Sequence, residues 1–380
     1  MRIYYFDLVA KKGIHTTFNS SMIEVLKKVF QTDEVIFKSE REHGIIVADK
    51  LGGEIILKPI RFLFSRFVNH TRLRDFLSSF LMFFQLLFAR KNDVIFIGLA
   101  FPYAINLIYI CSNLMHKRVY ITLHGELQHF IEQNHEIYKS RRSRYFRKMK
   151  FALSRKSGFV SYIVLGRPIY EAVNFVFNSK SDVIVINHPA KFYDFNYDIK
   201  FTLPLKIVLI GGCLKRKNGE KIFKLAKLLE NEIERNLVEF EIIGILGSDL
   251  KEADNGLVKY FDNVIAEDRF QEEIKKADFS LQLTTDNVSK AIASGTLIDS
   301  VYWAKPMLAL SSSYFNYFAT DFYKNNLVFE SIETMSQGIR KIILEFDIEK
   351  YKQCVLETVA MREKFSIESN AALFNRQRKG

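Results

Sequence analysis

A chain of 380 residues is too long to fold around one ordinary hydrophobic core, so we expect two domains. Apolar and charged fractions of 48% and 26% are ordinary for a globular protein. The three cysteines, Cys111, Cys213 and Cys354, are scattered, which excludes a disulfide framework and a CxxC metal pattern and fits a reducing compartment.

The formal net charge of +12 is unevenly distributed. Residues 1–200 contain 30 Lys and Arg against 17 Asp and Glu, whereas residues 201–380 contain 25 against 26. The whole basic surplus therefore lies in the first half. A partner that is itself anionic is expected to meet that half.

Strands and helices alternate through the first half. The N-terminal apolar run lacks a small-residue cleavage site and predicts a first strand rather than a signal peptide. Alternation predicts a largely parallel, doubly wound sheet. We expect strands at 3–9, 94–98, 117–123, 158–165 and 183–186, short apolar runs at 35–37 and 44–47, and helices at 17–30 (capped by Asn19 or Ser20), 76–89, 104–114 and 167–177.

No segment predicts a bilayer span. The best candidate, residues 76–89 (FLSSFLMFFQLLFA), falls short of the roughly twenty apolar residues that a span needs. It is followed by a polar turn and a buried strand, so we expect a helix that delivers the chain to a parallel strand. The protein is predicted to lie on a membrane rather than to cross it.

The second half repeats the architecture after a connection at 190–204. Two such sheets in tandem predict an α/β protein of two doubly wound, Rossmann-like domains that face a cleft at the carboxyl ends of their strands. We expect domains at 1–195 and 205–350, with a helical segment 351–380 that packs back toward the first domain. The elements expected here are strands at 205–210, 240–245, 258–264, 279–283 and 305–310, helices at 220–231, 270–276 and 297–304, and mostly helix from 334 to 376.

Two basic runs lie in the first half. Residues 139–156 carry nine Lys and Arg and no acid, and residues 58–74 interleave Arg61, Arg66, Arg72 and Arg74 with large apolar residues such as Phe67 and Val68. Basic residues among apolar ones suit an anionic bilayer surface. Binding to nucleic acid is the rival interpretation of these basic runs. A basic surface that simply faces the solvent is the third. The predicted membrane contacts are Arg141, Arg142, Arg144, Arg147 and Lys148.

Residues 211–219 form a loop that leaves a predicted strand and precedes a helix. Its glycines, including Gly212, permit close backbone approach, and Lys215, Arg216 and Lys217 can neutralise a diphosphate. The spacing matches neither a GxGxxG fingerprint nor a Walker loop. A solvated basic loop is therefore the alternative.

Residues 294–296 (Ser294, Gly295 and Thr296) open a second predicted helix at a strand end. Free N–H groups and the positive end of a helix dipole make such a terminus an anion site. Asp299 is expected in the first turn, where it can accept hydrogen bonds from sugar hydroxyls. A plain strand–loop–helix–strand unit is the alternative.

Two features of the first half also follow strands. His124 closes the strand predicted at 117–123, where ligand-handling residues gather, although a capping or buried histidine is equally expected. The Lys12–Gly13 turn is a weaker candidate, with Gly13 approaching the diphosphate or an acceptor.

Three segments of the second half resemble the nucleotide-sugar half of GT-B fold glycosyltransferases, closest to the family 4 type. They are residues 211–229 (GGCLKRKNGEKIFKLAKLL), 240–247 (FEIIGILG) and 277–310 (ADFSLQLTTDNVSKAIASGTLIDSVYWAKPMLAL). The first half, with TLHGEL at 122–127, is similar to the acceptor domain of that family.

The resemblance implies that Arg216 and Lys217 bind the donor diphosphate. In that family the loop–helix segment carries two glutamates separated by seven residues. Asp299 stands where the second is expected and Ala291 where the first is expected, so Asp286 or Lys290 would have to substitute.

The resemblance further implies transfer of a sugar from a nucleotide-diphosphate donor to a lipid-linked or glycan acceptor, with retention of configuration. Such enzymes build bacterial surface polysaccharide (O-antigen, capsule or exopolysaccharide) on the cytoplasmic membrane face. His124 would contact the donor sugar or orient the acceptor. Asp299 would hold a donor hydroxyl, with Ser294 and Thr296 nearby. No DxD-like pair stands in a suitable loop, so we expect no metal ion or other cofactor. The resemblance also implies no nucleic-acid partner.

Two rival functions remain open. A GT-B fold also serves sugar-nucleotide epimerases, which need acid–base carboxylates; the alanine at position 291 counts against that activity. The chain could instead be a non-catalytic polyanion-binding protein with residues 139–156 as its working surface.

Overall fold

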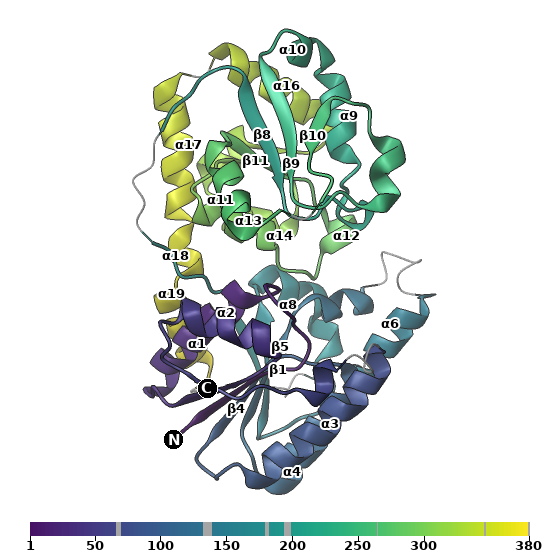
Figure 1. The fold of residues 1–380 in the computed structure, drawn as a ribbon, viewed down its shortest axis with the longest axis vertical. Coiled ribbons are helices and arrows are strands. Elements are labelled where there is room, and N and C mark those ends of the chain that lie inside the picture. Colours follow the sequence, from purple (N-terminus) through teal and green to yellow (C-terminus); the bar gives the residue numbers. More distant parts are fainter. Residues whose placement is uncertain are drawn as a thin grey trace. The chain divides into compact units, whose positions relative to one another are not determined.

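The structure is a computed structural model that describes residues 1–65, 70–131, 139–178, 182–193, 199–263, 265–345 and 347–378. The chain divides into two compact units (Figure 1). Unit 1 comprises Met1–Lys191, Ala291–Ala293 and Phe365–Gly380, and unit 2 comprises Phe192–Lys290 and Ser294–Lys364. Each unit is built on one parallel sheet with helices, as the alternation of the sequence predicts.

The sheet of unit 1 has seven strands in the order β3-β2-β1-β4-β5-β6-β7, all parallel. The order reverses between β1 and β4, and in open α/β sheets ligands bind outside the carboxyl ends of the strands at such a point. The central strands are buried along their whole length, as is typical of parallel sheets covered on both faces. The strands are β1 Ile3–Asp7, β2 Val35–Lys38, β3 Ile56–Leu57, β4 Val94–Leu99, β5 Val119–Leu123, β6 Val160–Leu165 and β7 Asp182–Ile186.

The helices of unit 1 differ from the predicted ones at the start of the first helix and at residues 44–47. Their bounds are α1 Thr16–Phe30, α2 Arg41–Lys50, η1 Phe62–Phe64, α3 Thr71–Phe88, α4 Pro102–Met115, η2 Gly125–Phe130, α6 Arg141–Phe146, η3 Arg147–Met149, α7 Lys150–Leu153, α8 Arg167–Val173, η4 Asn174–Val176 and α19 Ile367–Arg378.

Helix α1 has no side-chain cap. It begins at Thr16, and the preceding His15 is left-handed with φ 61°. Asn19 and Ser20, expected as caps, lie inside the helix; Asn19 is buried and its Oδ1 accepts a 2.7 Å hydrogen bond from Tyr5 Oη. The cap prediction was therefore wrong, because a buried polar contact keeps Asn19 on the helix.

Two further segments of unit 1, residues 44–47 and 139–156, are helical. The apolar run 44–47 lies inside α2, because the Glu40 carboxylate accepts the N–H groups of Glu42 and His43 and opens a helix there. The basic run 139–156 forms α6, η3 and α7 in succession. Arg66, Phe67 and Val68 of the other basic run lie outside the described residues.

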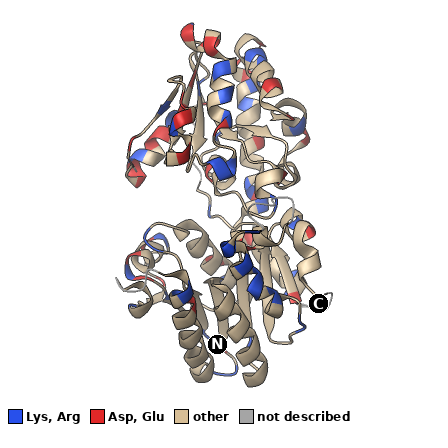
Figure 2. Cartoon of the chain, turned by 90° about the vertical axis from the view of Figure 1, so that its right-hand side faces the viewer, with Lys and Arg blue, Asp and Glu red and all other residues tan. Residues whose placement is uncertain are grey.

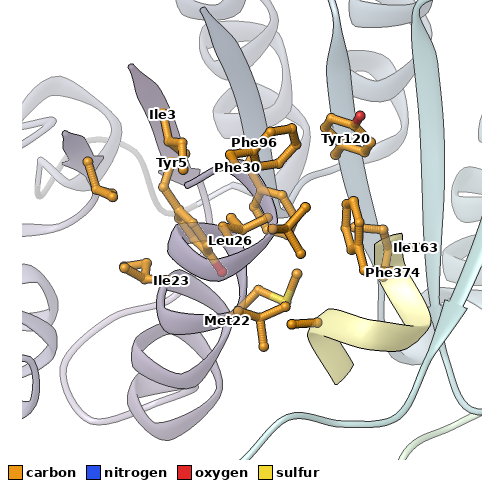
Figure 3. Close-up of a cluster of buried hydrophobic side chains, with 14 of the residues drawn as sticks. Ile3, Tyr5, Met22, Ile23, Leu26, Phe30, Phe96, Tyr120, Ile163 and Phe374 are labelled. Atoms are coloured by element: carbon orange, nitrogen blue, oxygen red, sulfur yellow. The ribbon is translucent and has the colours of Figure 1, made fainter. Parts of the chain in front are cut away.

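Helix α19 completes the core of unit 1 (Figure 3). Phe374 is fully buried, and its ring centroid lies 5.3 Å from that of Tyr120 and 6.1 Å from that of Phe30. The preceding α17 belongs instead to unit 2, where Tyr351 Oη donates to Asp278 O at 2.8 Å. The segment expected at 351–380 is therefore divided between the units at Phe365.

The sheet of unit 2 has six parallel strands in the order β10-β9-β8-β11-β12-β13, so its order reverses between β8 and β11. Its strands are β8 Leu205–Ile210, β9 Val238–Ile243, β10 Val258–Tyr260, β11 Phe279–Gln282, β12 Met307–Leu310 and β13 Val328–Phe329. Its helices are η5 Lys215–Lys217, α9 Lys221–Leu228, α10 Glu230–Glu234, η6 Ser248–Ala253, α11 Glu267–Lys276, α12 Asp286–Ser289, α13 Gly295–Tyr302, α14 Ser313–Phe318, α15 Asp321–Asn326, α16 Ile332–Glu345, α17 Ile348–Ala360 and α18 Arg362–Phe365.

The charges follow the two units. In Figure 2 the helices of unit 2 carry Lys or Arg beside Asp or Glu. In its sheet, an ion pair of 2.6 Å joins Lys206 of β8 to Glu241 of β9. Residues 139–156 add only positive charge to unit 1. Among the described helices, none combines the length and the apolar character that crossing a bilayer requires.

Candidate functional site

The loop after β8 begins with a close backbone approach that only glycine permits. Gly244 has φ 149°, and a Cβ placed on it would lie 2.0 Å from Gly211 O. Gly211 has φ 84°, and its N–H donates to Ile243 O at 2.8 Å. The ends of β8 and β9 are therefore pressed together, and the chain turns sharply into Gly212 and the basic residues.

Three cations follow on the short helix η5. Lys215 and Arg216 are exposed, and Lys217 is partly buried. Burial, then Arg216, lowers the pKa of Lys217, and Asp299 raises it in part. Asn218 closes the turn at φ 59°, and its Nδ2 donates to Leu283 O at 3.1 Å and Thr285 Oγ1 at 3.2 Å, which joins this loop to the one after β11.

The N-terminus of α13 lies against the same loop. Ser294 Oγ caps it by accepting the Leu297 N–H at 3.2 Å, and Thr296 Oγ1 donates to Ile210 O at 3.3 Å. A Cβ on Gly211 would lie 4.0 Å from Thr296 Oγ1, and Gly295 is exposed. Unpaired N–H groups of a first turn beside three cations form an arrangement that suits a diphosphate.

Asp299 lies one turn later than expected. Because Ser294 is the cap and Gly295 the first helical residue, Asp299 is the fifth residue of α13, and no acidic residue stands in the first turn. The dipole argument for Asp299 was therefore wrong. Its electrostatic partner is Lys217, on the loop after β8.

The candidates to replace the family glutamate are differently placed. Asp286 begins α12, and its carboxylate accepts the backbone N–H of Ser313 at 2.9 Å and the hydroxyl of the same residue, so it is committed to the start of α14. Lys290 follows α12 and is partly buried, and Ala291 is fully buried.

In unit 1, three histidines from distant parts of the sequence meet around Phe18. The ring of His124 lies 4.9 Å from that of His15 and 4.6 Å from that of Phe18, and the ring of His188 lies 5.1 Å from that of Phe18. His15 follows the loop after β1, His124 follows β5 and His188 follows β7. The carboxyl edge of the parallel sheet brings them together.

All three imidazoles are neutral at neutral pH. Burial lowers the pKa of His15, and burial with His15 lowers that of His188 to about 4. The pKa of His124 is well below its usual value for the same reason, with His15 and His188 adding to burial. His124 Nε2 lies 2.9 Å from Gly98 O, so it carries the proton and leaves Nδ1 as an acceptor.

Two ring nitrogens of this cluster are buried without a hydrogen-bond partner among the described residues, Nδ1 of His15 and Nδ1 of His188. Beside them, Glu126 Oε2 accepts the N–H of His124 at 2.7 Å, and burial raises the pKa of Glu126 to about 7. This cluster can bind hydroxyl groups and exchange protons near neutrality. Only His124 was predicted; the position of His15 and His188 after strands was the signal that could have found them.

Gly13 is exposed, with open space around its Cα. The unusual backbone falls instead on Lys12 and His15, at φ 51° and 61°. His43 holds the turn from beneath, since its Nδ1 lies 2.8 Å from Lys12 O and its Nε2 lies 2.8 Å from Asn19 Nδ2. A strained turn fixed by buried polar contacts is a common feature of binding sites.

The residues predicted to touch a membrane separate into two groups. Arg141, Arg144 and Lys148 are exposed and line one cavity with Arg72. Arg142 instead lies over the ring of Phe146, 5.8 Å from its centroid, and Arg147 is partly buried. Within the described ranges, no group of three or more His, Cys, Asp or Glu side chains is placed to hold a metal ion.

No protein-family model matches the chain, and no curated protein matches it in sequence. Solved structures match along its whole length. Anabaena HepE in complex with UDP-glucose is 13% identical over 100% of this chain and 98% of that chain, with a TM-score of 0.62. The lipopolysaccharide outer core galactosyltransferase WaaB is 12% identical over 100% and 99%, with a TM-score of 0.63.

An alpha,alpha-trehalose-phosphate synthase (UDP-forming) from Burkholderia vietnamiensis is 9% identical over 100% of this chain and 98% of that chain, with a TM-score of 0.61. Together with the two parallel sheets, this likeness shows that the chain has the GT-B fold of these proteins. The expected fold class is confirmed.

Proposed function

We propose that the chain is a glycosyltransferase that moves a sugar from a nucleotide-diphosphate donor to a lipid-linked or glycan acceptor. The observation that carries this proposal is the meeting of Lys215, Arg216 and Lys217 with the N-terminus of α13 where the strand order of unit 2 reverses. The structures of HepE with UDP-glucose and of a UDP-forming synthase support a UDP-linked donor.

The basic loop has a defined part in this reaction. When the glycosidic bond to the donor breaks, negative charge gathers on the departing diphosphate. Arg216 and Lys217, with Lys215 beside them, would stabilise that charge together with the N–H groups at Gly295 and Thr296. Because these cations neutralise the diphosphate, we propose that the reaction needs no metal ion.

The sugar would be held by hydroxyl contacts. In unit 2, Asp299 can accept a hydrogen bond from a sugar hydroxyl. In unit 1, the neutral imidazole of His124 can accept a hydrogen bond from a hydroxyl at Nδ1, because its Nε2 is bonded to Gly98 O. Beside His124, burial raises the pKa of the Glu126 carboxyl to about 7. We propose retention of configuration and a role in bacterial surface polysaccharide synthesis, to which the name of WaaB lends support.

Glu126 also favours a second candidate function. A carboxyl group with a pKa of about 7 beside neutral histidines is suited to proton transfer at a sugar carbon, as a sugar-nucleotide epimerase requires. Turnover of a nucleotide sugar without any acceptor would identify that activity. Consumption of donor only when an acceptor is present would favour the transferase.

The first experiment is a thermal-shift panel of nucleoside diphosphates and nucleotide sugars, each without and with a divalent metal. A ligand that binds the folded state raises the melting temperature. Arg216→Ala and Lys217→Ala should each weaken binding of the active nucleotide by roughly ten- to a hundredfold, because each removes a charge-assisted hydrogen bond.

Lys224→Ala is the matched control, since Lys224 is an exposed lysine on α9 of the same unit. Equal losses in all three variants would mean that net charge, not the loop, binds the nucleotide. Absence of any shift across the panel would contradict the proposal and favour a polyanion-binding protein.

A further inference from the structure

The solvent side of α3 is made of large apolar side chains. From Phe76 to Phe88 its exposed residues are Phe76, Phe80, Phe84, Leu87 and Phe88, and the last is 79% exposed. No charged residue stands between Asp75 and Arg90. A helix on the surface of a water-soluble domain ordinarily carries polar residues on that side, so this face indicates a partner that is itself apolar.

The apolar surface continues onto neighbouring helices. Helices α3 and α4 pack side by side (Figure 1), and α4 exposes Ile110 and Leu114, the latter by 73%. Phe151 of α7 is exposed as well, and its ring lies 6.2 Å from that of Tyr109 on α4. Exposed apolar side chains therefore lie on three helices of unit 1 that pack together, α3 on α4 and α4 on α7.

A basic cavity lies at one end of this face. It has a volume of about 280 Å³ and is lined by Arg72, Arg141, Arg144, Tyr145 and Lys148. Arg72 is in the first turn of α3, four residues before Phe76, so the cavity adjoins the start of the apolar row. In the described part of the chain, none of these four cations forms an ion pair with a carboxylate.

The carboxylate of Asp75, next to this cavity, is already occupied by hydrogen bonds within the protein. Asp75 is fully buried, accepts the N–H groups of Tyr103 and Ala104 at 2.7 Å each, and accepts the hydroxyl of Tyr145. It therefore joins α3, α4 and α6. Lys148 Nζ donates to Tyr103 Oη at 2.6 Å, which leaves its remaining N–H groups for a ligand.

We propose that unit 1 docks on an anionic phospholipid bilayer through the apolar face of α3 and α4, and that the cavity of Arg72, Arg141, Arg144 and Lys148 receives a lipid phosphate. A helix whose apolar side enters the interface, with cations beside it at head-group level, is the arrangement that an anionic bilayer binds. RNA would meet the cations but leave the phenylalanines in water. The residues of this surface belong to none of the proposed donor contacts.

The test is co-sedimentation with vesicles of phosphatidylglycerol in phosphatidylcholine, against vesicles of phosphatidylcholine alone. Arg72→Gln, Arg141→Gln and Arg144→Gln together should weaken binding to the anionic vesicles by about a hundredfold, because each cation near such a surface contributes roughly fivefold. Phe80→Ser with Phe84→Ser should weaken it by about tenfold or more through lost insertion.

Each variant has a matched control. Lys224→Gln, Arg235→Gln and Lys251→Gln remove the same charge from exposed positions of unit 2, and Phe175→Ser removes an exposed phenylalanine of unit 1 that lies on η4. Both controls should bind vesicles as the unaltered protein does. The nucleotide thermal shift shows whether each variant is folded. Loss of that shift would count against the proposed function, not against docking on the membrane.

Insertion has its own readout. The sequence has a single tryptophan, Trp303, and Phe84→Trp adds a second one on α3. Lipids brominated along their chains should quench the added emission. Excess inorganic phosphate should compete for the cavity but leave the apolar contribution intact. Binding that depends on the arginines but ignores Phe80→Ser with Phe84→Ser would overturn the proposal and indicate a polyanion surface; so would equal binding to both kinds of vesicle.

Discussion

The imidazole rings of His15 and His124 lie 4.9 Å apart at the carboxyl edge of the seven-stranded sheet. Burial lowers the pKa of His124 and the neighbouring His15 lowers it further, so protonation of this ring is disfavoured. A site that holds neutral imidazoles in contact is suited to hydroxyl ligands rather than to phosphates. This distinguishes the histidine cluster of unit 1 from the cationic loop of unit 2.

The histidine cluster should make unit 1 sensitive to acid. The pKa of His188 is about 4 in the folded protein, chiefly through burial, and near 6.5 in an unfolded chain. The unfolded state then binds more protons below pH 6.5, so the stability that the neutral ring allows is lost as pH falls from about 6.5 toward 4.

The glutamine of His188→Gln cannot be protonated in this range. Between pH 7.5 and pH 5 the free energy of unfolding of this variant should therefore fall by about 1–2 kcal/mol less than that of the unaltered protein. Urea unfolding at the two pH values, followed by a probe of unit 1, measures this difference. Parallel pH dependence in both proteins would mean that His188 is as easily protonated folded as unfolded.

The close approach of Gly244 to Gly211 predicts a large cost for a single methyl group. Gly244→Ala should destabilise unit 2 by about 2 kcal/mol or more, because a Cβ would collide with Gly211 O and the residue has φ 149°. Gly295→Ala is the control, since nothing lies within 4 Å of its Cβ position. Thermal unfolding measures the stability of both variants. Equal losses of stability would show that a Cβ at position 244 meets no collision.

Asp299 should act on nucleotide binding through the ammonium of Lys217. The Asp299 carboxylate raises the pKa of Lys217 against the larger lowering caused by burial and Arg216. Asp299→Asn should therefore lower that pKa, so that affinity for a nucleoside diphosphate falls at a lower alkaline pH than in the unaltered protein. Calorimetric titrations at several pH values above neutrality measure it, and an unchanged profile would show that Asp299 acts on a sugar hydroxyl alone.

The packing of α19 predicts a core defect from a change near the C-terminal end of the described chain. Phe374→Ala should destabilise unit 1 by about 3–5 kcal/mol, because it removes a buried ring that contacts Phe30 and Tyr120. Phe175→Ala, at an exposed phenylalanine of the same unit, should change stability by about 0.5 kcal/mol or less. Hydrogen exchange of the backbone amides in β5 distinguishes the two variants. Similar protection in both would contradict the inference that α19 completes the core of unit 1.

The sheets were predictable because many of their strands are continuous apolar runs between polar turns, such as 94–97 and 307–310. The loop of Lys215 to Lys217 was predictable for a related reason, since glycine and three cations follow a strand directly. The meeting of His15, His124 and His188 was not, because each lies alone in the sequence and only the strand order brings them together.

The exposed face of α3 could not be predicted, for a different physical reason. Hydrophobicity along a segment reports how apolar a helix is, but not which of its sides another element covers. The sequence predicted a helix at 76–89 but not which of its sides is covered; between Phe76 and Phe88 the buried residues are Ser78, Ser79, Met82 and Leu86. The position of Asp299 likewise depended on where the Ser294 cap starts the helix, which composition does not specify.

The insertion of Phe374 among Phe30, Tyr120 and Ile163 also sets an order of events during synthesis (Figure 3). Translation delivers α1 and β5 early, whereas α19 leaves the ribosome only after every element of unit 2 has been made. Domains generally fold as units in the order in which they emerge. Here the first unit to emerge must wait with an open core, so unit 2 can reach its final packing before unit 1 does.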